Sequence, residues 1–110
     1  MREYSTKITT EAAKDIADLR AYYEDLVDTS SAKRFQAAAY ATVKKLEVFP
    51  ERYPIFDEAN GVRRVNMDKH KVAILYIIDN YQLEVVAVQV FHELQDPDNY
   101  REMLSERVKA

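Results

Sequence analysis

The sequence predicts an α+β fold in which an N-terminal strand and an antiparallel helical hairpin pack on a mainly antiparallel sheet. The expected order is β-α-α-β-β-β, followed by a short C-terminal helix. Apolar residues recur at helical spacing in the first half of the chain, and the period changes to two after Pro50. The 110 residues include one glycine and three prolines, so most of the chain is expected in regular elements. With 47% hydrophobic and 32% charged residues, residues 1–110 are expected to form a single domain.

The first predicted elements are a short strand and a helix. Tyr4, Thr6 and Ile8 alternate with polar residues, which is typical of an edge strand with one face in water. Thr9 and Thr10 then offer an N-cap. The helix that follows carries a core-facing stripe with spacings of three and four: Ala12, Ile16, Leu19, Tyr23 and Leu26.

A second helix follows after a short connection. Residues 28–31, Asp-Thr-Ser-Ser, all favour helix caps, so they separate the two helices and start the second. Because the connection is short, the helices are expected to be antiparallel neighbours. Pro50 is predicted to end the second helix. Its core-facing stripe is expected to comprise Ala32, Phe35, Ala39, Thr42, Leu46 and Phe49.

The second half of the chain is predicted to be a sheet, because its residues are β-branched and aromatic. Residues 50–61 are expected to be a loop held by two prolines, and residues 62–67 a strand. Residues 71–79 are almost continuously apolar, which indicates a central strand covered on both faces.

The last strand is predicted over residues 84–91, and it delivers His92 to the rim of the sheet. Strict alternation would place Val86, Val88 and Val90 on the same face as His92. Residues 98–110 have helical spacing, so they are expected to form a C-terminal helix or a segment that orders on a partner.

Composition excludes several classes of site. Cysteine is absent, which excludes disulfides, thiolate nucleophiles and cysteine-based zinc sites. The first five residues lack the apolar stretch of a signal peptide, and the longest apolar run, residues 72–78, is too short to span a bilayer, so a cytoplasmic location away from membranes is expected. A net charge of −3 gives no global attraction for nucleic acids, although a local basic patch is compatible with it.

Several short segments, in order along the chain, resemble the RelE/ParE toxins of bacterial type II toxin–antitoxin systems. The resemblance spans most of the chain. The matching segments are residues 8–12 (ITTEA), residues 49–54 (FPERYP), residues 61–64 (GVRR), the central strand through Tyr76, residues 90–92 (VFH) and residues 95–96 (QD).

This resemblance implies a growth-inhibiting toxin that is neutralised by a cognate antitoxin protein. Two branches of the family differ in mechanism. RelE-like members cleave mRNA on the ribosome without a metal, whereas ParE-like members inhibit DNA gyrase by binding it. No cofactor is expected in either branch. A third possibility is a domain of the same fold that serves as an interaction module without toxicity.

Metal-free RNA cleavage needs a proton acceptor, a proton donor and cations for the charge on phosphate. The candidate catalytic residues are His92, Arg64, Arg63, Lys71 and Glu93. His92 can exchange a proton near neutral pH, and Glu93 beside it can act as a base or orient it. Because Arg63 and Arg64 are adjacent in a strand, they are expected to point to opposite faces, so at most one shares a cleft with His92.

Two departures from the ribonuclease pattern weaken the ribonuclease interpretation and leave the choice between the two branches open. After the last strand, where ribonuclease members often carry arginine or lysine, this chain has Glu93, Leu94 and Gln95. Residues 72–74 also lack a basic residue within the central strand. The negative net charge also weakens the ribonuclease interpretation, since a protein that works in the ribosomal A site is expected to be basic.

Ordinary structural roles also fit these residues. His92 can be a strand-end histidine bonded to a loop carbonyl or to Asp96, and Arg63 and Arg64 can be solvated partners of nearby carboxylates. His70 lies between two lysines and is expected to be a solvated turn residue. No metal site is predicted, because the four-residue spacing of His92 and Asp96 suits a metal only on a helix.

Overall fold

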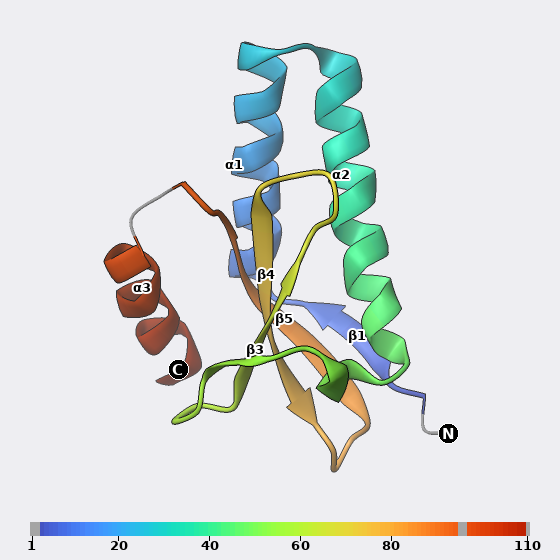
Figure 1. The fold of residues 1–110 in the computed structure, drawn as a ribbon, viewed down its shortest axis with the longest axis vertical. Coiled ribbons are helices and arrows are strands. Elements are labelled where there is room, and N and C mark those ends of the chain that lie inside the picture. Colours follow the sequence, from blue (N-terminus) through green and yellow to red (C-terminus); the bar gives the residue numbers. More distant parts are fainter. Residues whose placement is uncertain (1–2, 95–96, 110) are drawn as a thin grey trace.

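The computed structural model describes residues 3–94 and 97–109, which form the α+β fold predicted from the sequence (Figure 1). Asp96 and Gln95, and any bond that they make to His92, lie outside the described residues. Two 3-10 turns, η1 (Lys45–Glu47) and η2 (Pro50–Arg52), follow the second helix. The main elements in chain order are β1 (Ser5–Ile8), α1 (Thr10–Leu26), α2 (Thr29–Lys44), β2 (Ile55–Asp57), β3 (Val62–Asn66), β4 (Val72–Asp79), β5 (Glu84–His92) and α3 (Pro97–Lys109).

The sheet has five strands in the order β1-β5-β4-β3-β2. Strand β4 is central and pairs antiparallel with β3 and β5, as its continuous apolar sequence predicts. Strand β1 lies at one edge and pairs parallel with β5, from Ser5 opposite Glu84 to Ile8 opposite Ala87. The helical hairpin between β1 and the later strands therefore forms a crossover connection.

Each face of the sheet carries its own hydrophobic core. Helices α1 and α2 cover one face, and their tips project beyond the sheet (Figure 1). Helix α3 covers the other face through Leu104, which is 1% exposed. The hairpin-side core includes Ile16, Phe35, Leu46, Val65, Val72, Ile74, Tyr76, Val85 and Val90. The α3-side core comprises Val62, Ala73, Leu75, Val88, Phe91 and Leu104.

The predicted helix caps are present. Thr9 is the N-cap of α1, and its hydroxyl accepts a hydrogen bond from the Ala12 amide at 3.1 Å. Asp28 is the N-cap of α2, and its carboxylate accepts from the Ser31 amide at 2.6 Å. That hydrogen bond lowers the pKa of the Asp28 carboxyl below its ordinary value.

Phe49 departs from the predicted second helix. Helix α2 ends at Lys44, and Phe49 lies beyond η1 with φ 50° and ψ 55°, in the left-handed region. Its side chain is 51% exposed, so its place in the core-facing stripe is wrong. The segment predicted to be a loop also contains η2 and the three-residue strand β2, which pairs with β3.

The last strand contains a β-bulge that changes which residues share a face. Leu75 pairs with Gln89 but Tyr76 pairs with Ala87, so β5 has one extra residue at Val88. Val86 and Val88 pack on the α3 side, whereas Val90 packs on the hairpin side. The prediction that Val86, Val88 and Val90 share one face is therefore wrong, because a bulge shifts the alternation by one residue.

Candidate functional site

Arg64 lies on the α3 side of the sheet, because it pairs with Leu75, whose side chain belongs to that core. Its guanidinium carbon is 5.3 Å from the centroid of the Phe91 ring. Its Nε donates to Asn66 Oδ1 at 2.9 Å, and its Nη2 is 3.3 Å from Glu93 Oε1. Arg64 and Glu93 thus form a half-exposed ion pair beside an aromatic ring.

A second arginine, Arg101, stacks on a second phenylalanine ring, which packs against Phe91. The rings of Phe91 and Phe56 lie 6.3 Å apart, and the Arg101 guanidinium is 4.6 Å from the Phe56 centroid. We call Arg64, Phe91, Phe56 and Arg101 the arginine–phenylalanine row. Arginine stays protonated at all relevant pH values, so the row offers fixed cations and aromatic surface but no proton transfer.

His92 lies on the opposite face. It pairs with Val72, which is buried in the hairpin-side core, so the two side chains share that face. The Leu94 amide donates to His92 Nδ1 at 3.1 Å. Because Nδ1 accepts this bond, the neutral ring carries its proton on Nε2. The structure therefore does not bring the imidazole of His92 and the guanidinium of Arg64 to one side of the sheet.

The remaining candidates are divided between the two sides. Arg63 and Arg64 point to opposite faces, as predicted, and Arg63 donates to the backbone carbonyls of Glu51 and Tyr53 at 2.9 and 2.6 Å. Arg63 pairs with Tyr76, and His92 pairs with Val72. Because these two β4 residues are four positions apart, Arg63 and His92 are separated by roughly 13 Å along the strand direction. Of the five predicted catalytic residues, the structure brings Arg64 and Glu93 into side-chain contact.

Lys71 contributes its backbone. Its carbonyl accepts a hydrogen bond from the Glu93 amide at 2.7 Å, and its side chain is exposed. This bond fixes the chain where it leaves β5, so Lys71 sits beside Glu93 at the rim of the sheet. The site thus contains one ion pair, one exposed lysine and a histidine on the opposite face of the sheet. These groups suit binding better than RNA cleavage, which needs a general acid and a general base around the same phosphate.

His70 was expected to be solvated, and this is wrong. Its ring lies edge-on to Tyr23 and Phe35, with centroids 5.7 and 5.5 Å away. Its Nδ1 is buried and has no hydrogen-bond partner within the described part of the chain. Burial, with a smaller contribution from Arg34, lowers the pKa of the His70 imidazole. The turn between β3 and β4 is thus packed against the helical hairpin.

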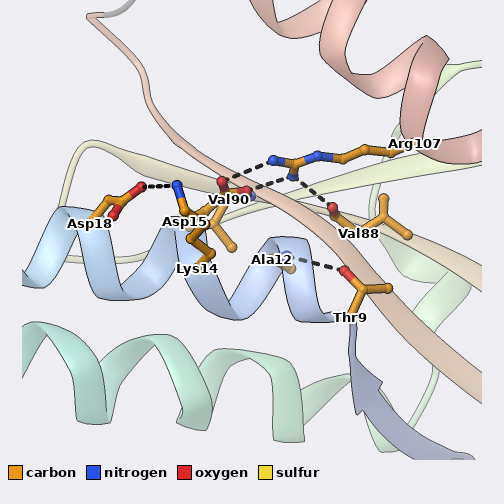
Figure 2. Close-up of polar contacts among 8 residues, drawn as sticks. All are labelled: Thr9, Ala12, Lys14, Asp15, Asp18, Val88, Val90 and Arg107. Atoms are coloured by element: carbon orange, nitrogen blue, oxygen red, sulfur yellow. Dashed lines mark hydrogen bonds and ion pairs between the residues drawn. The ribbon is translucent and has the colours of Figure 1, made fainter.

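Sequence reasoning also missed an ion pair between α1 and α3. Arg107 donates to Asp15 Oδ2 at 2.7 Å and to Asp15 Oδ1 at 3.0 Å, and both side chains are 14% exposed (Figure 2). The same groups bind strand β5: Arg107 donates to the Val88 carbonyl, and the Val90 amide donates to Asp15. These hydrogen bonds with Asp15 raise the pKa of the Arg107 guanidinium.

Strand β1 is shorter than β5, and this difference explains why Asp15 and Arg107 bind the backbone of β5. Pairing with β1 stops at Ala87, so the rest of β5 has no partner strand on that side. Asp15 and Arg107 supply the missing acceptor and donor at Val88 and Val90. One signal was available in the sequence: Asp15 immediately precedes Ile16 and is three residues from Ala12, so it borders the buried stripe.

Within residues 3–94 and 97–109, no group of three or more metal-ligating side chains is positioned to hold an ion. No helix in the described part of the chain is long and apolar enough to cross a membrane.

Comparisons with known proteins place these features in context. Residues 6–97 match the family described as the ParE toxin of the type II toxin–antitoxin system parDE. No curated protein is similar enough in sequence to match the chain. Among solved structures, the chromosomal ParDE system of P. aeruginosa is similar, with a TM-score of 0.72 and 19% identity over 82% of this chain and 96% of that chain.

Two RelE structures also share the fold. The RelBE2 toxin–antitoxin complex of Mycobacterium tuberculosis has a TM-score of 0.62 and 24% identity, covering 86% of this chain and 97% of that chain. A free mutant of the E. coli toxin RelE has a TM-score of 0.58 and 13% identity, covering 97% of this chain and 96% of that chain.

Proposed function

Because the chain belongs to the family of ParE toxins of type II toxin–antitoxin systems, we propose that it arrests growth by binding DNA gyrase and that a cognate antitoxin neutralises it. The chain is the toxin component of such a module, and the proposal concerns its target and mechanism. Its place of action is the cytoplasm, where gyrase works. No catalytic step is required of the protein, since inhibition by binding needs only a complementary surface.

The observation that carries the proposal is the separation of His92 from Arg64 by the sheet. Acid–base cleavage of RNA needs a proton-transferring group and a cation around the same phosphate. Here the Arg64 guanidinium is paired with Glu93 on one face, and His92 shares the other face with Val72. The family match supports the same branch.

A metal-independent mRNA endoribonuclease is the second candidate. The arginine–phenylalanine row favours it, because stacked guanidinium and phenyl groups can bind phosphates and bases of single-stranded RNA. In this case Glu93 would be the base nearest to Arg64, and the likeness in fold to RelE toxins would extend to activity.

Induced expression without the antitoxin gene separates the two candidates. For a gyrase inhibitor we expect growth arrest, activation of a DNA-damage reporter and unchanged 5′ ends of transcripts. The purified protein should also inhibit DNA supercoiling by purified gyrase. New transcript 5′ ends with unaffected supercoiling would contradict the proposal, and an absence of growth arrest would favour an interaction module.

A pair of variants sharpens this test. His92→Gln keeps a side chain that can bond to the Leu94 amide but cannot transfer a proton near neutral pH. We expect it to retain growth arrest and inhibition of supercoiling. Arg64→Gln removes the cation from the arginine–phenylalanine row and tests whether this surface contributes to binding. If His92→Gln abolished toxicity while the protein stayed folded, the binding mechanism would be wrong.

A further inference from the structure

A hollow of about 520 Å³ lies at the end of β4 opposite to His92. It is formed by three segments that are distant in sequence: the residues before β1, Phe49 with the η2 turn, and the turn after β4. Eight residues of β4 separate it from the rim where His92 lies, roughly 26 Å along the strand. The hollow is therefore remote from His92. Its lining residues are Tyr4, Phe49, Glu51 and Asn80.

Phe49 is held at this hollow in a backbone conformation that phenylalanine rarely adopts. Its φ of 50° is in the left-handed region, where a side chain meets the following carbonyl. The surroundings fix it, since the buried Tyr76 hydroxyl donates to the Pro50 carbonyl at 2.6 Å and the Arg52 amide donates to the Phe49 carbonyl at 3.2 Å. The result is a half-exposed phenyl ring that core packing does not explain.

Polar groups complete the lining. The buried Tyr4 side chain donates through its hydroxyl to Asn80 Oδ1 at 2.7 Å, which orients the Asn80 amide. The Glu51 side chain is exposed, and its carboxylate has no hydrogen bond or ion pair within the described residues. The neighbouring cations are already engaged: Arg63 binds two backbone carbonyls, and Arg52 stacks on the Tyr53 ring at 5.0 Å.

We propose that this hollow receives an arginine side chain from a partner protein. A guanidinium group is flat and cationic, so it can stack on the exposed Phe49 ring while it donates two hydrogen bonds to the Glu51 carboxylate. A phosphate or carboxylate would instead face the negative charge of Glu51, and an apolar side chain would displace water from that carboxylate without supplying a hydrogen bond. Charge and shape together select an arginine-bearing peptide segment.

The test uses the isotopically labelled full chain and N-acetyl-arginine amide as the probe, followed by NMR. We expect saturable shifts of the Asn80 side-chain amide and the Phe49 resonances. N-acetyl-citrulline amide has nearly the same shape without the charge and should bind at least about tenfold more weakly. Equal binding of both probes would overturn the proposal. Shifts spread over the acidic surface of α1, rather than at the hollow, would overturn it as well.

Matched variants assign the binding to the lining residues. Glu51→Gln removes the charge, and Phe49→Asn removes the ring but suits the left-handed backbone, so both should fold. Each is expected to weaken binding of the arginine probe about tenfold. The control is Tyr81→Ala. Tyr81 lies in the same β4–β5 turn as Asn80, but it is 97% exposed and does not line the hollow, so this variant should leave binding unchanged. Unweakened binding by folded Glu51→Gln and Phe49→Asn would contradict the assignment.

Discussion

At the scale of single residues, the Asp15–Arg107 ion pair contacts three elements of the fold. The two side chains bind each other, and they also satisfy the Val88 carbonyl and the Val90 amide on β5. Because both are largely shielded from water, removing one leaves the other as a buried charge without its ion-pair partner. A single ion pair therefore joins α1, β5 and α3.

Arg107→Met is expected to lower the free energy of unfolding by about 3 kcal/mol, because the Asp15 carboxylate then remains buried without a counter-charge. Urea denaturation measures this change. The control is Lys14→Ala, which breaks the exposed Lys14–Asp18 pair on the same helix (Figure 2) and should cost at most about 0.5 kcal/mol. Equal effects of the two substitutions would show that burial of the Asp15 pair does not matter.

His70 predicts a dependence of stability on pH. Its folded-state pKa lies below the ordinary value of 6.5, so below that pH the unfolded chain binds this proton more readily than the folded chain. The contribution of the neutral His70 ring to the free energy of unfolding is therefore fully present above pH 6.5 and is lost as the pH falls below that value. His70→Phe, which keeps an aromatic ring against Tyr23 and Phe35, should lose less stability than the natural chain between about pH 7.5 and about pH 5.5. Parallel denaturation profiles would contradict this prediction.

At the scale of elements, the sequence predicts what depends on local spacing and misses what depends on distant segments. The caps at Thr9 and Asp28 and the central position of β4 follow from short patterns, and the structure confirms them. Strand β2 has three residues and follows Pro54, too short for alternation to be recognised. The bulge at Val88 shifts the faces of β5, and no local pattern indicates it.

The candidate site was predictable to a similar extent. Alternation correctly placed Arg63 and Arg64 on opposite faces. The contact of Arg64 with Glu93 joins residues 29 positions apart, and the stacking of Arg101 on Phe56 depends on how α3 docks. Such contacts are set by tertiary packing, so the periodicity of one segment cannot reveal them.

The N-cap of α1 gives a prediction at this scale. Thr9→Ala removes the acceptor for the Ala12 amide and is expected to lower the free energy of unfolding by about 1 kcal/mol. Thr29→Ala is the control, because Thr29 is exposed in the first turn of α2, where Asp28 provides the cap. Its effect on thermal unfolding should be smaller. If both variants unfolded at the same temperature, the Thr9 cap would not stabilise α1 appreciably.

At the scale of the whole molecule, the sheet separates two cores of unequal size. The hairpin-side core includes residues of α1, α2 and the sheet, whereas the α3-side core depends on one helix. Leu104 of α3 is fully buried in this second core. Phe91 belongs both to this core and to the arginine–phenylalanine row, and Arg101 of α3 completes the row, so the packing of α3 and the position of the row are linked.

Leu104→Ala is expected to lower the free energy of unfolding by about 3 kcal/mol, through lost burial and the cavity that remains. Met103→Ala, one position away and only partly buried, should cost clearly less. Urea denaturation compares the two variants, and binding of a hydrophobic dye reports exposure of the second core. A cost for Leu104→Ala no greater than that for Met103→Ala would mean that α3 contributes little to the fold.

The short pairing of β1 with β5 also bears on how the free protein behaves in a crowded cell. One edge strand has four residues and the other three. Past Ala87, where β5 has no partner strand on the β1 side, Asp15 and Arg107 bind its backbone at Val90 and Val88. Another copy of the chain finds few backbone positions at either edge to extend the sheet. The free chain is therefore expected to resist edge-to-edge polymerisation through its sheet.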